Sequence, residues 1–132
     1  MKRIVSRITV EVLGSPQNYV EETLQKVLGK LQVEEGIRIH STQVFESKQM
    51  DNKLYNTFAD IEFETTSLKR MMEICYDYTP SIIEILEPAG MEVDSNDISD
   101  FLNDFLARIH KYSMVLKKLQ AENILMKREK SK

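Results

Sequence analysis

Cysteine is almost absent from this chain, since Cys75 is the one copy among 132 residues. A single cysteine cannot close a disulfide within the chain, and this favours a reducing compartment. No stretch approaches the roughly 20 consecutive apolar residues that a membrane-spanning helix requires. The N-terminal segment alternates apolar with polar residues, whereas a signal peptide needs a continuous apolar run. We therefore expect a cytoplasmic protein without a membrane segment.

Sequence motifs of catalysis and cofactor binding are missing as well. The four glycines are scattered and form no phosphate-binding loop. The chain has no paired-cysteine metal site, no His-x-x-x-His pair and no nucleophile elbow. Carboxylates are plentiful, but their spacing does not single out an acid–base pair. These absences predict no cofactor and no metal site, and they favour a non-enzymatic function.

Hydrophobic residues make up 42% of the chain, which is enough for the core of one folded domain. Residues 3–13 alternate between apolar and polar and predict a half-buried strand. Ser15 followed by Pro16 is a helix start signal, and Gly36 is a plausible stop. Between these signals the apolar residues recur at helical spacing, so residues 16–34 are predicted to form an amphipathic helix.

The next segment alternates again over residues 37–47 and predicts a second strand. This alternation places Ile39 and Phe45 on the buried face, and His40 and Val44 on the exposed face. A polar loop follows, and residues 54–65 then alternate once more, so the two strands would form a hairpin.

Ser67 can cap a further helix that ends before Pro80, and the sequence "SIIEIL" predicts a last short strand. The predicted order is therefore strand, helix, strand, strand, helix, strand. This is the ferredoxin-like split βαβ arrangement. We predict an α+β domain over residues 1–94, with a four-stranded antiparallel sheet and two helices on one of its faces.

Residues 95–130 predict a long amphipathic helix, because they contain neither proline nor glycine and begin with clustered acidic residues. Its apolar spacings alternate between four and three from Ile98 onward, as in a coiled coil. We call this stripe the heptad seam; after Ile98 it comprises Leu102, Phe105, Ile109, Tyr112, Leu116, Leu119, Asn123 and Met126. The apolar stripe is wide at its start, where Phe101 and Leu106 flank it, and narrow farther along. The narrow part is typical of a helix that pairs with another helix.

Asn123 occupies an a position of the seam when Leu102 is taken as position a. A single asparagine at such a position fixes register and oligomeric state, at some cost in stability. We therefore predict self-association through this helix into a homodimer or a larger homo-oligomer. Two alternatives stay open: the helix could fold back across the open face of its own sheet, or it could bind a different protein.

The open face of the predicted sheet is the second candidate site. It would carry Arg7, His40, Phe58, Asp60 and Glu84, a mixture that could bind a small ligand or support acid–base chemistry. One histidine without nearby ligands in sequence is a weak metal signal. The carboxylates would repel phosphate, so this face is a poor surface for RNA.

The C-terminal segment is the third candidate. From residue 117 to residue 132 it holds six Lys or Arg and two Glu, a net charge of +4 within a chain of net charge −3. A nucleic acid could bind there through Lys127, Arg128, Lys130 and Lys132. Cations also complement the dipole at a helix end, which explains the same residues without any partner. Cys75 is expected to be buried and unreactive, because nothing nearby would lower its pKa.

Overall fold

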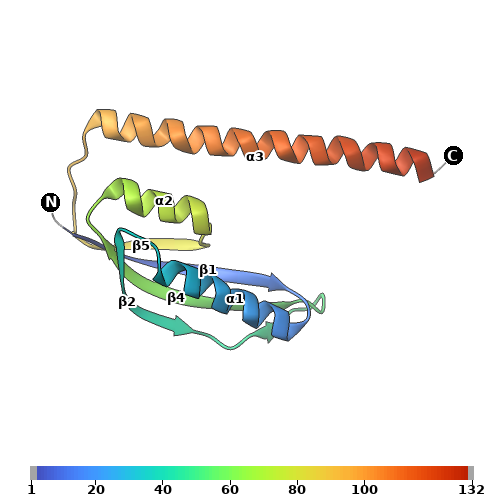
Figure 1. Cartoon of the computed structure of the whole chain (residues 1–132), viewed down its shortest axis with the longest axis horizontal. Helices are drawn as coiled ribbons and strands as arrows, with labels where there is room; N and C mark the ends of the chain where they lie inside the picture. Colours follow the sequence, from blue (N-terminus) through green and yellow to red (C-terminus); the bar gives the residue numbers. More distant parts are fainter. Residues whose placement is uncertain (1–2, 131–132) are drawn as a thin grey trace. The chain divides into compact units, whose positions relative to one another are not determined.

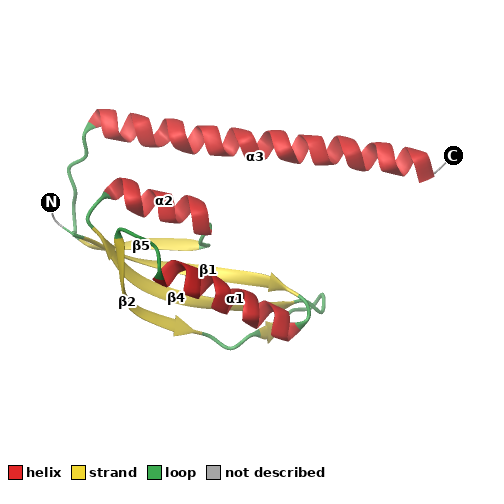
Figure 2. Cartoon of the chain, in the orientation of Figure 1, coloured by secondary structure: helices red, strands yellow, loops and turns green. Residues whose placement is uncertain are grey.

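The computed structural model describes residues 3–130 (Figure 1). Five strands and three helices follow one another along the chain (Figure 2). In sequence order they are β1 (Ile4–Gly14), α1 (Gln17–Gln32), β2 (Ile37–Val44), β3 (Lys48–Gln49), β4 (Tyr55–Thr65), α2 (Leu68–Tyr78), β5 (Ile82–Glu87) and α3 (Ser95–Lys130).

The sheet has the strand order β2-β4-β1-β5, and all neighbouring strands are antiparallel. β4 lies between β1 and β2, with Ile61 opposite Ile8 on one side and Phe63 opposite Ile39 on the other. The two-residue β3 pairs with the start of β4, inside the loop for which no strand was predicted. This topology is ferredoxin-like, so the predicted α+β fold is confirmed.

The core lies between one face of the sheet and the two shorter helices. Alternate residues of β1 and β4 point into it, because side chains of a strand alternate between its faces. They meet the apolar stripes of α1 and α2. The largest fully buried apolar side chains are Ile8, Val20, Leu24, Leu31, Ile61, Phe63 and Ile74. The opposite face of the sheet carries the polar residues of the same strands.

The two serines predicted to cap helix starts have different outcomes. The hydroxyl of Ser67 accepts a hydrogen bond from the backbone N–H of Arg70 at 3.3 Å and caps α2, as predicted. The Ser15 cap is wrong, because Pro16 occupies the cap position of α1 and no side chain caps this helix. The carbonyl of Pro16 instead accepts the first helical hydrogen bond, from Val20 at 3.2 Å.

A bulge in β2 overturns the predicted alternation of that strand. Ile39 lies opposite Phe63 and Ser41 lies opposite Glu62, so the residue between them is an extra one. An extra residue exchanges the faces of every side chain that follows it. Phe45 consequently stacks on Phe58 of the polar face, with ring centroids 4.5 Å apart, and was wrongly predicted to be buried. Val44, predicted to be outward, lies on the helix side opposite Ala59.

The chain forms two compact parts, one up to Met91 and one from Glu92 onward. The first contains the sheet with α1 and α2, and the second consists chiefly of α3. α3 is one uninterrupted helix of 36 residues. Its first turn contains Asp97 and its last turn contains Lys127, Arg128 and Lys130, the charge arrangement that the helix dipole favours.

Candidate functional site

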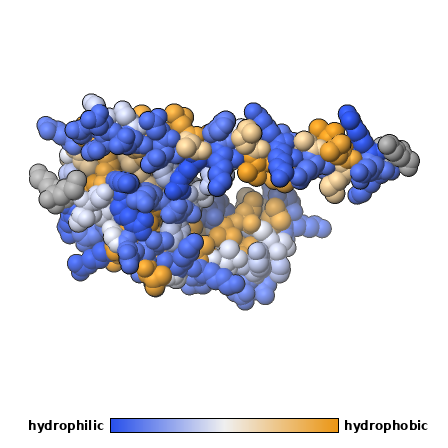
Figure 3. Space-filling model, turned by 45° about the horizontal axis from the view of Figure 1, so that its top comes forward, coloured by the Kyte–Doolittle hydropathy of each residue, from blue (hydrophilic) through white to orange (hydrophobic). Residues whose placement is uncertain are grey.

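The heptad seam lies on a single helix, since α3 includes every residue from Ile98 to Met126. None of the described side chains of α3 is buried. The apolar side chains of the seam have exposed fractions between 39%, for Phe105, and 60%, for Tyr112. Figure 3 shows hydrophobic patches along this helix, separated by hydrophilic side chains. Near its start Phe101 stacks on Phe105 with ring centroids 6.2 Å apart, where the apolar stripe is widest.

Charged residues flank the far end of the seam. With Leu102 at position a, Asn123 is an a residue, Glu122 is a g residue and Lys127 is an e residue. In a parallel pair of helices, g and e residues of opposite charge attract each other between the helices. The end of α3 therefore combines a polar seam residue with a complementary pair of flanking charges.

The polar face of the sheet carries a network of ion pairs and hydrogen bonds. A guanidinium nitrogen of Arg7 lies 2.7 Å from the carboxylate of Glu84 on the neighbouring strand, and this carboxylate raises the pKa of Arg7 further. Thr9 donates a hydrogen bond to Asp60 at 2.7 Å. Five carboxylates on this face accept hydrogen bonds from neighbouring strands: Glu11, Asp60, Glu62, Glu64 and Glu84.

Glu64 is the centre of the largest charge cluster on this face. Its carboxylate lies 2.9 Å from Nε2 of His40, 3.9 Å from Arg3 and 4.0 Å from Arg38. The hydrogen bond from His40 and the nearby positive charges lower the pKa of Glu64. His40 is the extra residue of the β2 bulge, so the bulge brings its ring toward β4.

The five residues predicted as a ligand site, Arg7, His40, Phe58, Asp60 and Glu84, thus share one face of the sheet. Each of them contacts a neighbouring side chain of the same face. Among residues 3–130, no three His, Cys, Asp or Glu side chains are arranged to hold a metal ion. The face is better suited to stabilising the sheet than to binding an anion, because its carboxylates already use the cations present.

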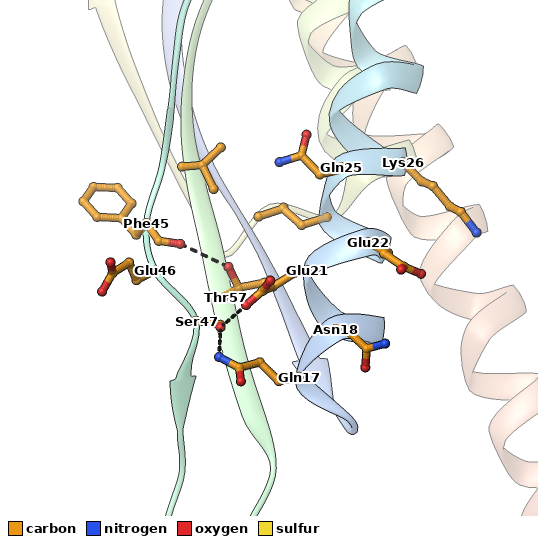
Figure 4. Close-up of a pocket in the computed structure, with 12 residues that line it drawn as sticks. Gln17, Asn18, Glu21, Glu22, Gln25, Lys26, Phe45, Glu46, Ser47 and Thr57 are labelled. Carbon is orange, nitrogen blue, oxygen red and sulfur yellow. Dashed lines mark hydrogen bonds between the residues drawn. The ribbon is translucent and has the colours of Figure 1, made fainter.

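A groove of about 970 Å³ lies between the first turns of α1 and the end of β2 (Figure 4). The hydroxyl of Ser47 accepts a hydrogen bond from Gln17 at 2.8 Å and donates one to Glu21 at 2.6 Å. These bonds hold the loop after β2 against α1. The carboxylates of Glu21, Glu22 and Glu46 line the groove together with one ammonium, from Lys26, and this balance disfavours anionic ligands. This groove could not be predicted from the sequence. The bulge in β2 that positions one of its walls does not interrupt the alternation of apolar and polar residues.

A second unpredicted cluster joins the loop after α1 to α2. Glu34 accepts hydrogen bonds from the phenol of Tyr78 at 2.7 Å and from Arg70 at 2.6 Å. These two bonds lower the pKa of Glu34, while burial and the carboxylate raise the pKa of Tyr78. Arg70 also donates to the backbone carbonyl of Glu35 at 2.7 Å. Glu34 is far from Arg70 and Tyr78 in the sequence, so no local sequence motif predicts this cluster.

The remaining candidates belong to none of these clusters. Lys127, Arg128 and Lys130 belong to the last turn of α3, and Lys132 lies outside the described residues. Cys75 is half-buried in α2, and burial raises the pKa of its thiol, which keeps it in the less reactive protonated form. No helix among residues 3–130 combines the length and the hydrophobicity that crossing a bilayer requires.

The fold and these surfaces define a small α+β protein of ferredoxin-like topology that carries a long heptad helix. The chain belongs to the MJ0538 family, whose model matches residues 6–132. The match includes both the sheet and α3, so the family is defined over the two parts together. No curated protein matches the chain.

Proposed function

We propose that this protein is a non-enzymatic assembly protein that forms a homodimer through α3. The observation that carries the proposal is the heptad seam on one uninterrupted 36-residue helix. Burying a leucine-sized side chain stabilises an interface by about 1.5–3 kcal/mol. Eight apolar side chains of the seam are available on each copy: Ile98, Leu102, Phe105, Ile109, Tyr112, Leu116, Leu119 and Met126.

A parallel, in-register pair explains both the asparagine of the seam and the charges that flank it. In this arrangement Asn123 lies against Asn123 of the second copy, and the two amides can bond to each other. Glu122 of each copy then lies near Lys127 of the other. An antiparallel pair would instead place Asn123 against an apolar residue, leaving a buried amide unsatisfied at a cost of about 1–3 kcal/mol.

The test compares one substitution on the seam with the same substitution off the seam. Leu116→Glu places a charge at an a position, whereas Ala121→Glu places it at an f position on the opposite side of α3. Light scattering of the full chain at tens of micromolar should give a dimer for the wild type and for Ala121→Glu, and a monomer for Leu116→Glu. A monomeric wild type, or identical masses for both variants, would contradict the proposal.

A further inference from the structure

The two edges of the sheet differ in a way that bears on assembly. β2 forms one edge and β5 forms the other (Figure 1). β2 carries exposed polar side chains and contains the bulge between Ile39 and Ser41. Bulges and polar or charged side chains are features that prevent an edge strand from pairing with another chain. The β2 edge is therefore protected.

The β5 edge has less of this protection, since Glu84 is the one charged side chain among its first four residues. Ile82, Ile83 and Ile85 are 63%, 42% and 39% exposed. The strand contains no proline, lysine or arginine, and its irregularity lies near its end, beyond Ile85. An exposed apolar edge strand is a template for the addition of another strand.

We propose that β5 pairs antiparallel with β5 of a second copy, centred on Glu84, so that two sheets join into one. The inference rests on the proposed α3 dimer, which brings the two copies together. β5 then provides a second contact within the same dimer.

The side chains of β5 favour this register. Ile83 and Ile85 lie opposite the buried Ile8 and Ser6 of β1, so both point to the helix side of the sheet. Pairing centred on Glu84 places Ile83 opposite Ile85 of the second copy, twice by symmetry. The two Glu84 side chains meet on the other face, where each is already neutralised by its own Arg7 at 2.7 Å.

The size of this contact explains why it depends on α3. Three partly exposed isoleucines and one strand edge fall short of the roughly 800 Å² per partner that stable interfaces bury. Strand pairing by itself would therefore be weak. Linkage through α3 raises the effective concentration of the second β5 into the millimolar range, which is enough to populate a weak contact.

The connection between the two interfaces is long enough for both to form at once. Seven residues separate Glu87 from Ser95 and can span up to about 25 Å. In the proposed strand pair the two Glu87 residues lie six positions apart, which is about 20 Å. The axes of two paired helices lie about 8–10 Å apart. Each connection therefore has to bring its helix only about 5 Å closer to the symmetry axis than its Glu87 lies.

The experiment introduces one cysteine at the proposed symmetry centre of the full chain. Glu84→Cys, in a Cys75→Ser background, is treated with a short bismaleimide at ten micromolar protein. The matched control is Thr42→Cys on the β2 edge, which is also exposed. Because Glu84 lies on the axis, Glu84→Cys should form a covalent dimer efficiently and Thr42→Cys should not.

Two added substitutions separate the inference from the proposed function. Leu116→Glu should reduce the Glu84→Cys cross-linking rate about 100-fold, from a millimolar effective concentration to the bulk concentration. Ile85→Lys should reduce the rate while light scattering still gives a dimer. A dimer in which Glu84→Cys reacts no faster than Thr42→Cys would overturn the β5 inference and leave the α3 dimer standing. A monomeric chain without cross-linking would overturn both.

Discussion

The phenol of Tyr78 donates a 2.7 Å hydrogen bond to the carboxylate of Glu34, which lies 44 positions earlier in the chain. Arg70 contacts the other oxygen of the same carboxylate at 2.6 Å. The loop after α1 is thereby tied to both ends of α2. This cluster and the helix caps give predictions about stability that are independent of assembly.

Glu34→Gln should lower the free energy of unfolding at neutral pH by about 1.5–3 kcal/mol, because hydrogen bonds to a charged group are lost. In the unsubstituted protein the pKa of Glu34 is lowered from the ordinary 4.5. The stabilisation by its carboxylate is therefore present above that pH, and it is lost as the pH falls through the folded pKa. Urea titrations between pH 3 and 7 measure both effects. Glu35→Gln is the control, and an equal loss in both variants would count against the cluster.

Gly36→Ala should destabilise the fold by about 1–2 kcal/mol. Gly36 has φ of +80°, and a Cβ there would lie 3.3 Å from the side chain of Arg70. Gly29→Ala is the matched change within α1, where nothing lies within 4 Å of the added atom. It should stabilise the protein by about 0.5–1 kcal/mol. Thermal melts that shift in the same direction for both variants would contradict this account.

Ser67→Ala should cost about 1 kcal/mol, because the hydroxyl caps α2. Ser15→Ala should have little effect, since no side chain caps α1. Both serines precede helices. Comparing the two variants therefore distinguishes the observed cap at Ser67 from the cap that the sequence alone suggested at Ser15. Chemical denaturation at neutral pH measures the difference, and a larger loss at Ser15 would show that the assignment of caps is wrong.

Asn123→Leu should strengthen the association of α3 and loosen its specificity, because an apolar a residue no longer selects one register. Light scattering should show larger oligomers or a mixture, together with a higher melting temperature. Asn103→Leu, at a b position outside the seam, is the control. An unchanged dimer in the Asn123 variant would mean that the asparagine does not set the oligomeric state.

The order of the elements was predictable because it depends on local periodicity and on caps such as Ser67. The β2 bulge was not predictable, since one extra residue at His40 preserves the apparent alternation up to Ile39 and exchanges the faces only afterwards. The Glu34–Arg70–Tyr78 cluster depends on contacts between distant residues, which periodicity does not encode. The heptad seam could be identified because it repeats along a single helix. The spacing of residues along that helix does not identify the surface that covers the seam.

Because α3 is uninterrupted, it also sets a fixed distance between its two ends. Its 36 residues span about 54 Å, and a helix without proline or glycine bends only gently. Whatever is attached at Ser95 is held at a set distance from whatever binds near Lys130. Inserting a heptad after Ala107 would lengthen this distance by about 10 Å and keep the seam in phase. Inserting four residues would instead rotate the two halves of the seam relative to each other.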